Sequence, residues 1–343
     1  MAKTKIEFVC RECGSSHHQW AGQCLDCKEW NTLEEVIISQ ATSSKPESLK
    51  DLPSSKVQNL SEIKSQNNHR LSTGLSELDR TLGGGLVDGS VVLIGGDPGI
   101  GKSTLILQAI AAINASSTTL YVSGEESAEQ VSDRAIRLGI KEDILFIGET
   151  HLEKIIKISK DTRPKVIVID SIQTMVTDLS NSAPGSVTQV RDCAAQLTQY
   201  AKQTNTILLM IGHVTKGGAL AGPRILEHMV DAVLYFEGDA GGRYRIIRAV
   251  KNRFGAVNEI SVFAMGEKGL QQVSNPSSIF LSNQENPSSG SMVMVTREAT
   301  RPLLVEIQAL VDQANGTPKR VSVGLDQNRL SLQLAILHKH SGI

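Results

Sequence analysis

The sequence predicts an α/β fold in which a parallel central sheet lies between two layers of helices. Short runs of aliphatic residues recur through residues 69–273 without the polar alternation of a half-exposed strand. Longer stretches with helical periodicity lie between these runs, and a glycine-rich loop joins the first strong run to such a stretch. The expected strands are 91–96, 118–123, 144–148, 165–170 and 206–212, and the expected helices include 103–115, 127–138 and 187–202.

Composition and charge exclude several classes of protein. Of the 343 residues, 40% are hydrophobic, and 35 Lys and Arg residues stand against 36 Asp and Glu residues. Wholesale disorder and a uniformly basic nucleic-acid coat are therefore excluded. The longest apolar runs, such as 206–212, are far shorter than the roughly 20 residues of a transmembrane helix, and the N-terminus lacks the apolar core of a signal peptide. We expect a cytoplasmic protein without membrane contact.

Changes in composition divide the chain into four segments. Residues 1–32 hold four of the five cysteines and both tryptophans, and residues 33–68 have the polar composition of a linker. Residues 69–273 carry the α/β pattern and end in a predicted strand–turn–strand hairpin. Residues 274–343 contain a strand signal, an apolar run and a last predicted helix, and they are few for an independent core.

The N-terminal cysteines have the spacing of a metal site. Cys10 and Cys13 form one C-x-x-C pair, and Cys24 and Cys27 form a second pair after ten residues. Four thiolates in two such turns favour tetrahedral Zn²⁺. A redox role is disfavoured because no thioredoxin-like βαβ pattern surrounds the pairs. We expect residues 1–32 to form a zinc-binding module that folds only with its metal.

Other side chains of this segment have less specific expectations. The histidines His17 and His18 are expected to be loop residues, since four cysteines complete the site. Trp20 and Trp30 are predicted to cover the small core, with contact to a partner protein as the alternative. The fifth cysteine, Cys193, lies on the apolar side of a predicted helix, so we expect it to be a buried small hydrophobe.

Residues 96–103 satisfy the phosphate-loop pattern G-x-x-x-x-G-K-[ST] between a strand and a helix. Glycines allow successive backbone N–H groups to face a phosphate, and the helix N-terminus adds positive charge. We expect Lys102 to reach the β- and γ-phosphates of ATP and Ser103 to ligate Mg²⁺. The alternative is a glycine turn before a helix. The candidate nucleotide-binding residues are Gly96, Asp97, Pro98, Gly99, Ile100, Gly101, Lys102, Ser103 and Thr104.

Acidic residues follow two other predicted strands, where parallel sheets bind ligands. Asp170 ends the run 165–170 and is expected to hold Mg²⁺, with a helix cap as the alternative. Glu125 and Glu126 follow the run 118–123, and Glu125 is the preferred candidate to polarise the attacking water. The alternative is that both glutamates lie in the first turn of a helix, where the dipole favours acids.

The order of these motifs resembles the bacterial RadA (Sms) DNA repair family. The resemblance rests on the four-cysteine module, GGDPGIGKST, YVSGEES, VIVIDSIQ and KNRFG at residues 251–255, and it covers essentially the whole chain. It implies a RecA-like P-loop core that assembles as a hexameric ring on single-stranded DNA, similar to DnaB-type helicases. It also implies branch migration of recombination intermediates alongside the RecA recombinase.

The resemblance extends to the C-terminal segment. Residues 274–343 are similar to the start of the α+β Lon-protease-like domain that closes the chains of this family, and the resemblance implies that only part of that domain is contained in these residues. The family's version has a structural and DNA-contacting role and lacks a working Ser–Lys dyad. We therefore expect no peptidase activity.

The KNRFG motif is expected to complete a neighbouring subunit's ATPase site. Lys251 and Arg253 are two residues apart on a predicted strand, so both side chains would leave one face. They could bind the γ-phosphate of a neighbour as a finger, and the alternative is a solvated cationic edge strand. By the same resemblance, His213 occupies the place of a γ-phosphate sensor, or it is a polar strand-end residue.

Two loops are candidates for contact with DNA. These are residues 177–186 and residues 213–224, of which the second supplies Lys216 and Arg224. A local charge of +3 between residues 213 and 255 favours salt-dependent binding of the DNA backbone. The alternative is a solvated basic face with mobile loops. A rival function is an ATP-gated assembly or signalling ATPase similar to KaiC, which would not act on DNA as a motor.

Overall fold

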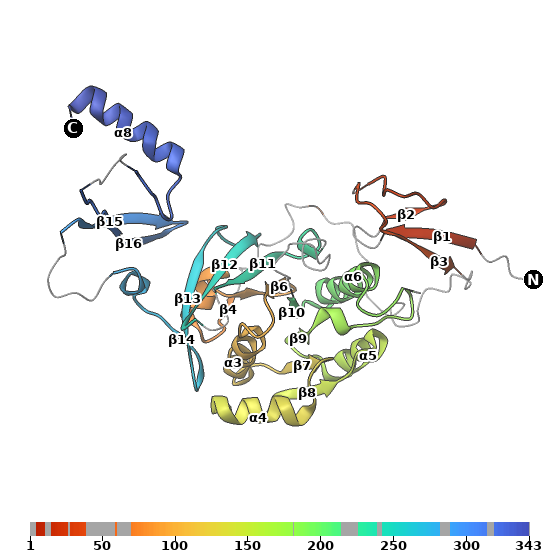
Figure 1. The fold of residues 1–343 in the computed structure, drawn as a ribbon. Helices are drawn as coiled ribbons and strands as arrows, with labels where there is room; N and C mark the ends of the chain where they lie inside the picture. Colours follow the sequence, from red (N-terminus) through yellow and green to blue (C-terminus); the bar gives the residue numbers. More distant parts are fainter. Residues whose placement is uncertain are drawn as a thin grey trace, which may run out of the picture. The chain divides into compact units, whose positions relative to one another are not determined.

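The computed structural model describes residues 5–10, 15–26, 28–38, 59, 70–180, 182–213, 226–238, 242–281, 289–313 and 319–342. The chain divides into two compact units, one of residues 1–276 with 296–303 and one of residues 277–295 with 304–343. Figure 1 shows the elements coloured along the chain. Among the helices of the described residues, none is long and apolar enough to cross a bilayer.

The N-terminal segment forms a small antiparallel sheet in the order β2-β1-β3 (Figure 1). Its strands are β1 (Lys5–Cys10), β2 (Ser16–His17) and β3 (Leu33–Ile38). The buried cluster beneath it consists of Cys10, Cys24 and Leu33, with Phe8 and Ala21 packed against it. Two of the three members of this cluster, taken over the side chains that the structure describes, are cysteines.

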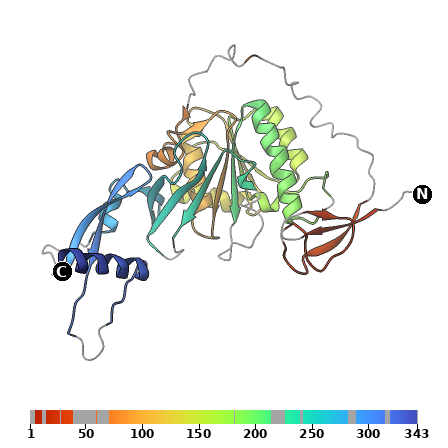
Figure 2. The same ribbon diagram turned by 90° about the horizontal axis from the view of Figure 1, so that it is seen from above.

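A nine-stranded sheet in the order β14-β13-β12-β11-β6-β10-β9-β7-β8 belongs to the first unit (Figures 1 and 2). The six strands from β11 to β8 are parallel, whereas β12, β13 and β14 continue the sheet in antiparallel pairing. The strands are β6 (Val91–Gly96), β7 (Thr119–Ser123), β8 (Leu145–Gly148), β9 (Val166–Asp170), β10 (Ile207–His213), β11 (Ala232–Glu237), β12 (Tyr244–Asn252), β13 (Ile260–Gly266) and β14 (Gly269–Gln272). The predicted α/β fold and its five parallel strands are confirmed.

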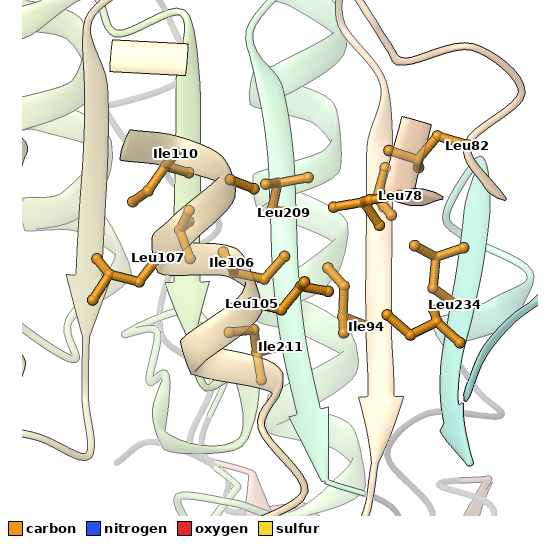
Figure 3. Close-up of a cluster of buried hydrophobic side chains, with 14 of the residues drawn as sticks. Leu78, Leu82, Ile94, Leu105, Ile106, Leu107, Ile110, Leu209, Ile211 and Leu234 are labelled. Atoms are coloured by element: carbon orange, nitrogen blue, oxygen red, sulfur yellow. The ribbon is translucent and has the colours of Figure 1, made fainter. Parts of the chain in front are cut away.

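Helices cover both faces of this sheet. Alternate residues of each strand face opposite layers, so Val92 and Ile94 of β6 belong to one buried cluster and Val91 and Leu93 to the other. The first layer contains α2 (Ser76–Thr81), α3 (Lys102–Asn114) and α4 (Ala128–Leu138), and the second contains α5 (Leu152–Thr162) and α6 (Val187–Thr204). Figure 3 shows side chains of α3 near Leu209 and Ile211 of β10 and Ile94 of β6, and Leu234 of β11 near Leu78 of α2.

Local signals set the helix ends. Ser127 caps α4 in a reciprocal capping box with Gln130, and Gly139 ends the helix with a left-handed φ of 71°. Ser186 caps α6 by accepting from the backbone of Gln189. These ends agree within two residues with the helices expected from periodicity.

The predicted hairpin after residue 229 is present but belongs to the central sheet. β11 pairs in parallel with β6, and β12 then runs back beside β11. β12 ends at Asn252, so the expectation that Arg253 lies on a strand is wrong. The backbone N–H of Arg253 still donates to Asp231 O at 3.0 Å, which continues the pairing one residue past the strand. The short β4 (Arg70–Leu71) and β5 (Leu86–Val87) form a separate pair.

The second unit contains a hairpin, a short 3₁₀ helix and a C-terminal helix. The hairpin strands are β15 (Ser291–Glu298) and β16 (Arg301–Gln308), the turn is η2 (Pro276–Ile279), and the helix is α8 (Gln327–Ser341). Of these elements, residues 296–303 of the hairpin and Pro276 of η2 belong to the first unit. Asp326 caps α8 by accepting from the backbone of Arg329, and α8 buries none of its side chains. The likeness to a Lon-like domain stays a prediction.

Candidate nucleotide-binding site

The predicted phosphate loop joins the end of β6 to the start of α3. Gly101 has a φ of 112°, and a Cβ there would lie 2.7 Å from Met265 Cε. At Gly96 a Cβ would lie 2.8 Å from Phe236 Cβ. No side chain caps α3, and its first turn contains no acidic residue. The N–H groups of that turn are therefore suited to bind an anion, which fits the phosphates of a nucleotide.

Lys102 is buried at the mouth of this loop. Its Nζ donates to Gly96 O and Asp97 O, each at 2.8 Å, and lies 3.3 Å from His213 Nδ1. Burial lowers the pKa of Lys102, and the carboxylates of Asp170, Glu125 and Asp97 oppose that shift. The ammonium group thus lies between the loop carbonyls and the acidic ends of the neighbouring strands.

The two predicted Mg²⁺ ligands lie together. Asp170 ends β9, and its buried carboxylate accepts hydrogen bonds from the hydroxyl groups of Tyr121 and Ser103. Burial raises the pKa of Asp170, whereas the two hydrogen bonds lower it. Ser103 follows Lys102 in the first turn of α3. A hydroxyl and a carboxylate oxygen in contact are suitable ligands for Mg²⁺.

Glu125 and Glu126 have different surroundings. Glu125 accepts a hydrogen bond from the hydroxyl of Ser171, and its Oε1 lies 3.1 Å from His213 Nε2. The hydrogen bond with His213 is the main reason that the pKa of Glu125 is lowered. Glu126 instead forms an ion pair with Arg134. Because α4 begins at Ala128, the alternative that both glutamates lie in a helical first turn is wrong.

His213 connects these groups at the end of β10. Its Nδ1 lies beside Lys102 and its Nε2 beside Glu125, while its backbone carbonyl accepts from Gln173 Nε2 at 3.3 Å. The chain then enters residues 214–225, where the predicted DNA-binding Lys216 and Arg224 lie outside the described residues. His213 therefore contacts the first residue of α3, next to the phosphate loop, and directly precedes residues 214–225 in the chain.

Lys251 and Arg253 converge on the segment before β11. Lys251 Nζ donates to Glu227 O at 2.6 Å, and Arg253 Nη1 lies 3.2 Å from Asp231 Oδ1. Asp231 is buried and also accepts from the Val91 backbone at 3.0 Å and from Lys202. The Arg253 side chain is 60% exposed. A buried carboxylate therefore anchors an arginine that faces solvent.

The KNRFG motif and the phosphate loop lie at opposite ends of the sheet. Asn252 of β12 pairs with Ala232 of β11, and Ala232 pairs with Val92 near the start of β6. The phosphate loop begins four residues later, at Gly96. A strand rises about 3.3 Å per residue, so the separation along the sheet is roughly 13 Å. Lys251 and Arg253 are thus directed away from the loop of their own chain.

The N-terminal cysteines form a second candidate site. The Cys10 thiol donates to Thr32 Oγ1 at 3.2 Å, and Cys24 Sγ lies 3.5 Å from His17 Nε2 and 3.6 Å from Ser15 Oγ. Buried thiols with polar neighbours fit a bound Zn²⁺. The other predicted ligands, Cys13 and Cys27, lie outside the described residues.

Two expectations for this segment are wrong, whereas the one for the fifth cysteine is confirmed. His17 is not in a loop but in β2, with ligand-capable atoms of Cys24 and Asp26 within 4.8 Å. Trp20 and Trp30 are 60% and 67% exposed, so they do not cover the core. Cys193 is buried in the layer formed by α6, and this burial raises the pKa of its thiol to about 12.

Sequence reasoning missed several residues of both regions. Tyr121 lies inside an apolar strand and resembles a core residue until its hydroxyl is seen on Asp170. Ser171 and Asp231 gave weak signals, since one follows the predicted Mg²⁺ ligand and the other precedes a strand. Arg245, which contacts the phosphate loop, gave none.

Comparisons with known proteins agree with this geometry. A family profile described as an AAA domain matches residues 58–219, and one described as a rubredoxin metal binding domain matches residues 8–35. The fold and the site define a P-loop ATPase with an N-terminal zinc-ribbon module. The AAA domain implies ATP and Mg²⁺ as the ligands of the site.

Full-length matches identify the family. The DNA repair protein RadA of Pseudomonas aeruginosa is 55% identical to this chain over 345 residues. The RadA protein of Escherichia coli is 52% identical over 362 residues, and that of Bacillus subtilis is 47% identical over 348 residues. Each match covers 100% of this chain and 76% of the relative. The chain belongs to the RadA DNA repair protein family, as the sequence motifs predicted.

Proposed function

We propose that this protein is a DNA-dependent ATPase that works as a ring on single-stranded DNA. The ring, a hexamer, would promote branch migration of recombination intermediates alongside the RecA recombinase. The names of the relatives support a role in DNA repair, and the phosphate loop with its acidic neighbours supports ATP hydrolysis. Each ATP would be hydrolysed at the seam between two subunits.

One observation carries this proposal, the position of Lys251 and Arg253 at the end of the sheet opposite the phosphate loop. An arginine there cannot stabilise the phosphates bound by its own chain. It is nevertheless exposed and held at its base by Asp231. This arrangement suits a finger that acts on a neighbour's γ-phosphate.

The remaining roles follow from the contacts. Lys102 would bind the β- and γ-phosphates, and Ser103 and Asp170 would hold Mg²⁺, which neutralises charge on the phosphates when bound. Glu125 would orient and deprotonate the attacking water, because Glu126 is already paired with Arg134. His213 contacts both Lys102 and Glu125. It would therefore report the state of the site to the loop that follows it.

The other parts of the chain complete the proposal. Zn²⁺ would be held by the four cysteines of residues 1–32, and residues 33–68 would tether this module to the ATPase domain of residues 69–273. Residues 274–343 would form the first part of a Lon-like domain. DNA would contact the loops at 177–186 and 213–224, through Lys216 and Arg224.

ATP turnover with and without single-stranded DNA tests the proposal. We expect DNA to stimulate the wild type and Lys102→Ala to abolish turnover. Arg253→Ala should retain nucleotide binding but lose about 10³-fold or more in turnover. Arg191→Ala is the matched control, because Arg191 is also exposed and lies beside a carboxylate.

Mixing two inactive variants tests the seam itself. Lys102→Ala keeps the finger and Arg253→Ala keeps the phosphate loop, so mixed rings contain some complete sites and should recover turnover. Full turnover by assembled Arg253→Ala, or no recovery on mixing, would contradict hydrolysis between subunits. An ATP turnover rate that is the same with and without single-stranded DNA would favour the alternative of a KaiC-like assembly or signalling ATPase.

A further inference from the structure

Arg245 is a buried arginine behind the phosphate loop. It lies near the start of β12 and is only 2% exposed. Its Nε donates to Ile100 O at 2.9 Å, and its Nη1 donates to Gly242 O at 2.5 Å and to Tyr244 O at 3.0 Å. Burying a guanidinium group is costly unless its hydrogen bonds are satisfied, and one of these bonds goes to the loop that binds phosphate.

The bond to Ile100 determines the direction of one peptide in that loop. In a planar trans peptide the C=O and N–H groups point in opposite directions. The carbonyl of Ile100 faces Arg245, so the N–H of Gly101 in the same peptide points away from Arg245. A carbonyl turned the other way would present negative charge to a phosphate. Arg245 therefore favours the orientation in which the loop binds anions.

The sheet register explains why β12 can reach this loop. Tyr235 of β11 pairs with Gly95 at the end of β6 and with Arg248 of β12, so the first residues of β12 lie beside the phosphate loop. On the next strand, Arg245 pairs with the buried Phe263. Strands rather than a mobile loop thus hold Arg245, which limits its movement.

We propose that Arg245 is a positioning residue for the nucleotide phosphates, acting through the Ile100–Gly101 peptide. The inference rests on the proposed ATPase site, but not on the ring or on DNA. Arg245 does not touch the nucleotide itself. Its loss should therefore weaken phosphate binding without removing any group that takes part in hydrolysis.

The test is the affinity of full-length variants for a fluorescent ADP analogue with Mg²⁺, measured without DNA. A hydrogen bond from a charged group contributes enough to change affinity by about 10- to 100-fold. We expect Arg245→Gln to raise the dissociation constant by that amount. Arg245→Lys should raise it less, because lysine keeps a charged donor but not the planar fork. Arg137→Gln, at an exposed arginine on α4, is the matched control and should bind as the wild type does.

Two further measurements separate positioning from a general structural role. At saturating ATP, turnover by Arg245→Gln should fall less than its KM rises, since the catalytic groups are intact. Circular dichroism and the melting temperature show how much of each variant is folded. If Arg245→Gln does not fold, the affinity of Arg245→Lys for the ADP analogue is the test of the proposal.

Three outcomes would overturn the proposal. One is an unchanged ADP affinity in a folded Arg245→Gln or Arg245→Lys protein. The second is an equal loss of affinity in Arg137→Gln. The third is a loss of turnover at saturating ATP with an unchanged KM. Because binding is measured without DNA, a failure of DNA stimulation would count against the motor and leave this result standing.

Discussion

The cysteine module and the nine-stranded sheet are stabilised in different ways. Among its described side chains the module has a hydrophobic cluster of three buried residues, of which two are cysteines, whereas the sheet has two extensive apolar layers. A small sheet with so little apolar burial needs a metal or a cross-link to remain folded. The larger sheet folds by burying its own side chains. The stability of the module therefore depends on metal, whereas the stability of the sheet depends on the packing of its apolar side chains.

The two regions can be followed separately. Both tryptophans of the chain, Trp20 and Trp30, belong to the module and are largely exposed. The long helices α3 to α6 all belong to the sheet region. Tryptophan emission therefore reports on the module, and far-ultraviolet circular dichroism reports mainly on the sheet region.

Removing the metal should have the largest effect and change only the module. Structural Zn²⁺ in small modules contributes an apparent 10–16 kcal/mol, approximately, to folding. A chelator combined with a thiol reagent should change the intensity and anisotropy of the tryptophan emission, because the tryptophans gain mobility, and leave the helical signal unchanged. Cys193→Ala should bind and lose metal as the wild type does, since Cys193 lies in the sheet region. A loss of the helical signal when the metal is removed would contradict the independent stability of the module and the sheet region.

A cavity in the sheet region should have the opposite effect. Ile106 is buried where α3 packs on the sheet (Figure 3). We expect Ile106→Ala to lower the free energy of unfolding by about 2–5 kcal/mol. Denaturant titration followed by circular dichroism measures this, and the tryptophan transition should not move. Ile136→Ala, at a side chain that is 71% exposed, is the control and should change little.

A smaller effect is expected at His17, and it tests whether this residue supports the metal site. His17 lies 3.5 Å from Cys24 Sγ, and partners of metal ligands typically contribute about 10- to 100-fold to metal affinity. We expect His17→Ala to weaken Zn²⁺ binding in that range, as measured by competition with a chelating dye. His18→Ala, at the next residue and exposed, is the control. Equal affinities for both variants would mean that His17 contributes nothing to the site.

Much of the sheet was predictable because its strands are buried on both faces. Runs such as 91–96 and 165–170 have apolar interiors, and the helices α4 and α6 carry clear serine caps. The phosphate loop and Asp170 were also predictable, since each directly follows a recognisable run. The antiparallel strands β13 and β14 were missed, because the glycines and polar residues on either side of them favour turns.

Contacts between distant segments were not predictable. Local spacing indicates that Lys251 and Arg253 are near each other, but only the pairing of β12 with β11 places them opposite the phosphate loop. Arg245 reads as one more charge on a basic strand until the fold buries it against Ile100. The partner of each buried polar group depends on tertiary packing, which periodicity does not describe.

The ion pair of Arg253 with Asp231 has a consequence for how fast Arg253 could move during the proposed cycle of ATP hydrolysis. The guanidinium group already has an anionic partner in Asp231, so movement onto a phosphate would exchange one anion for another. The buried Asp231 carboxylate would keep its hydrogen bonds from Lys202 and from the Val91 N–H after Arg253 moved, so it would not be left as an unpaired buried charge. A side chain under these conditions can leave its resting place and return to it many times without a large barrier in either direction.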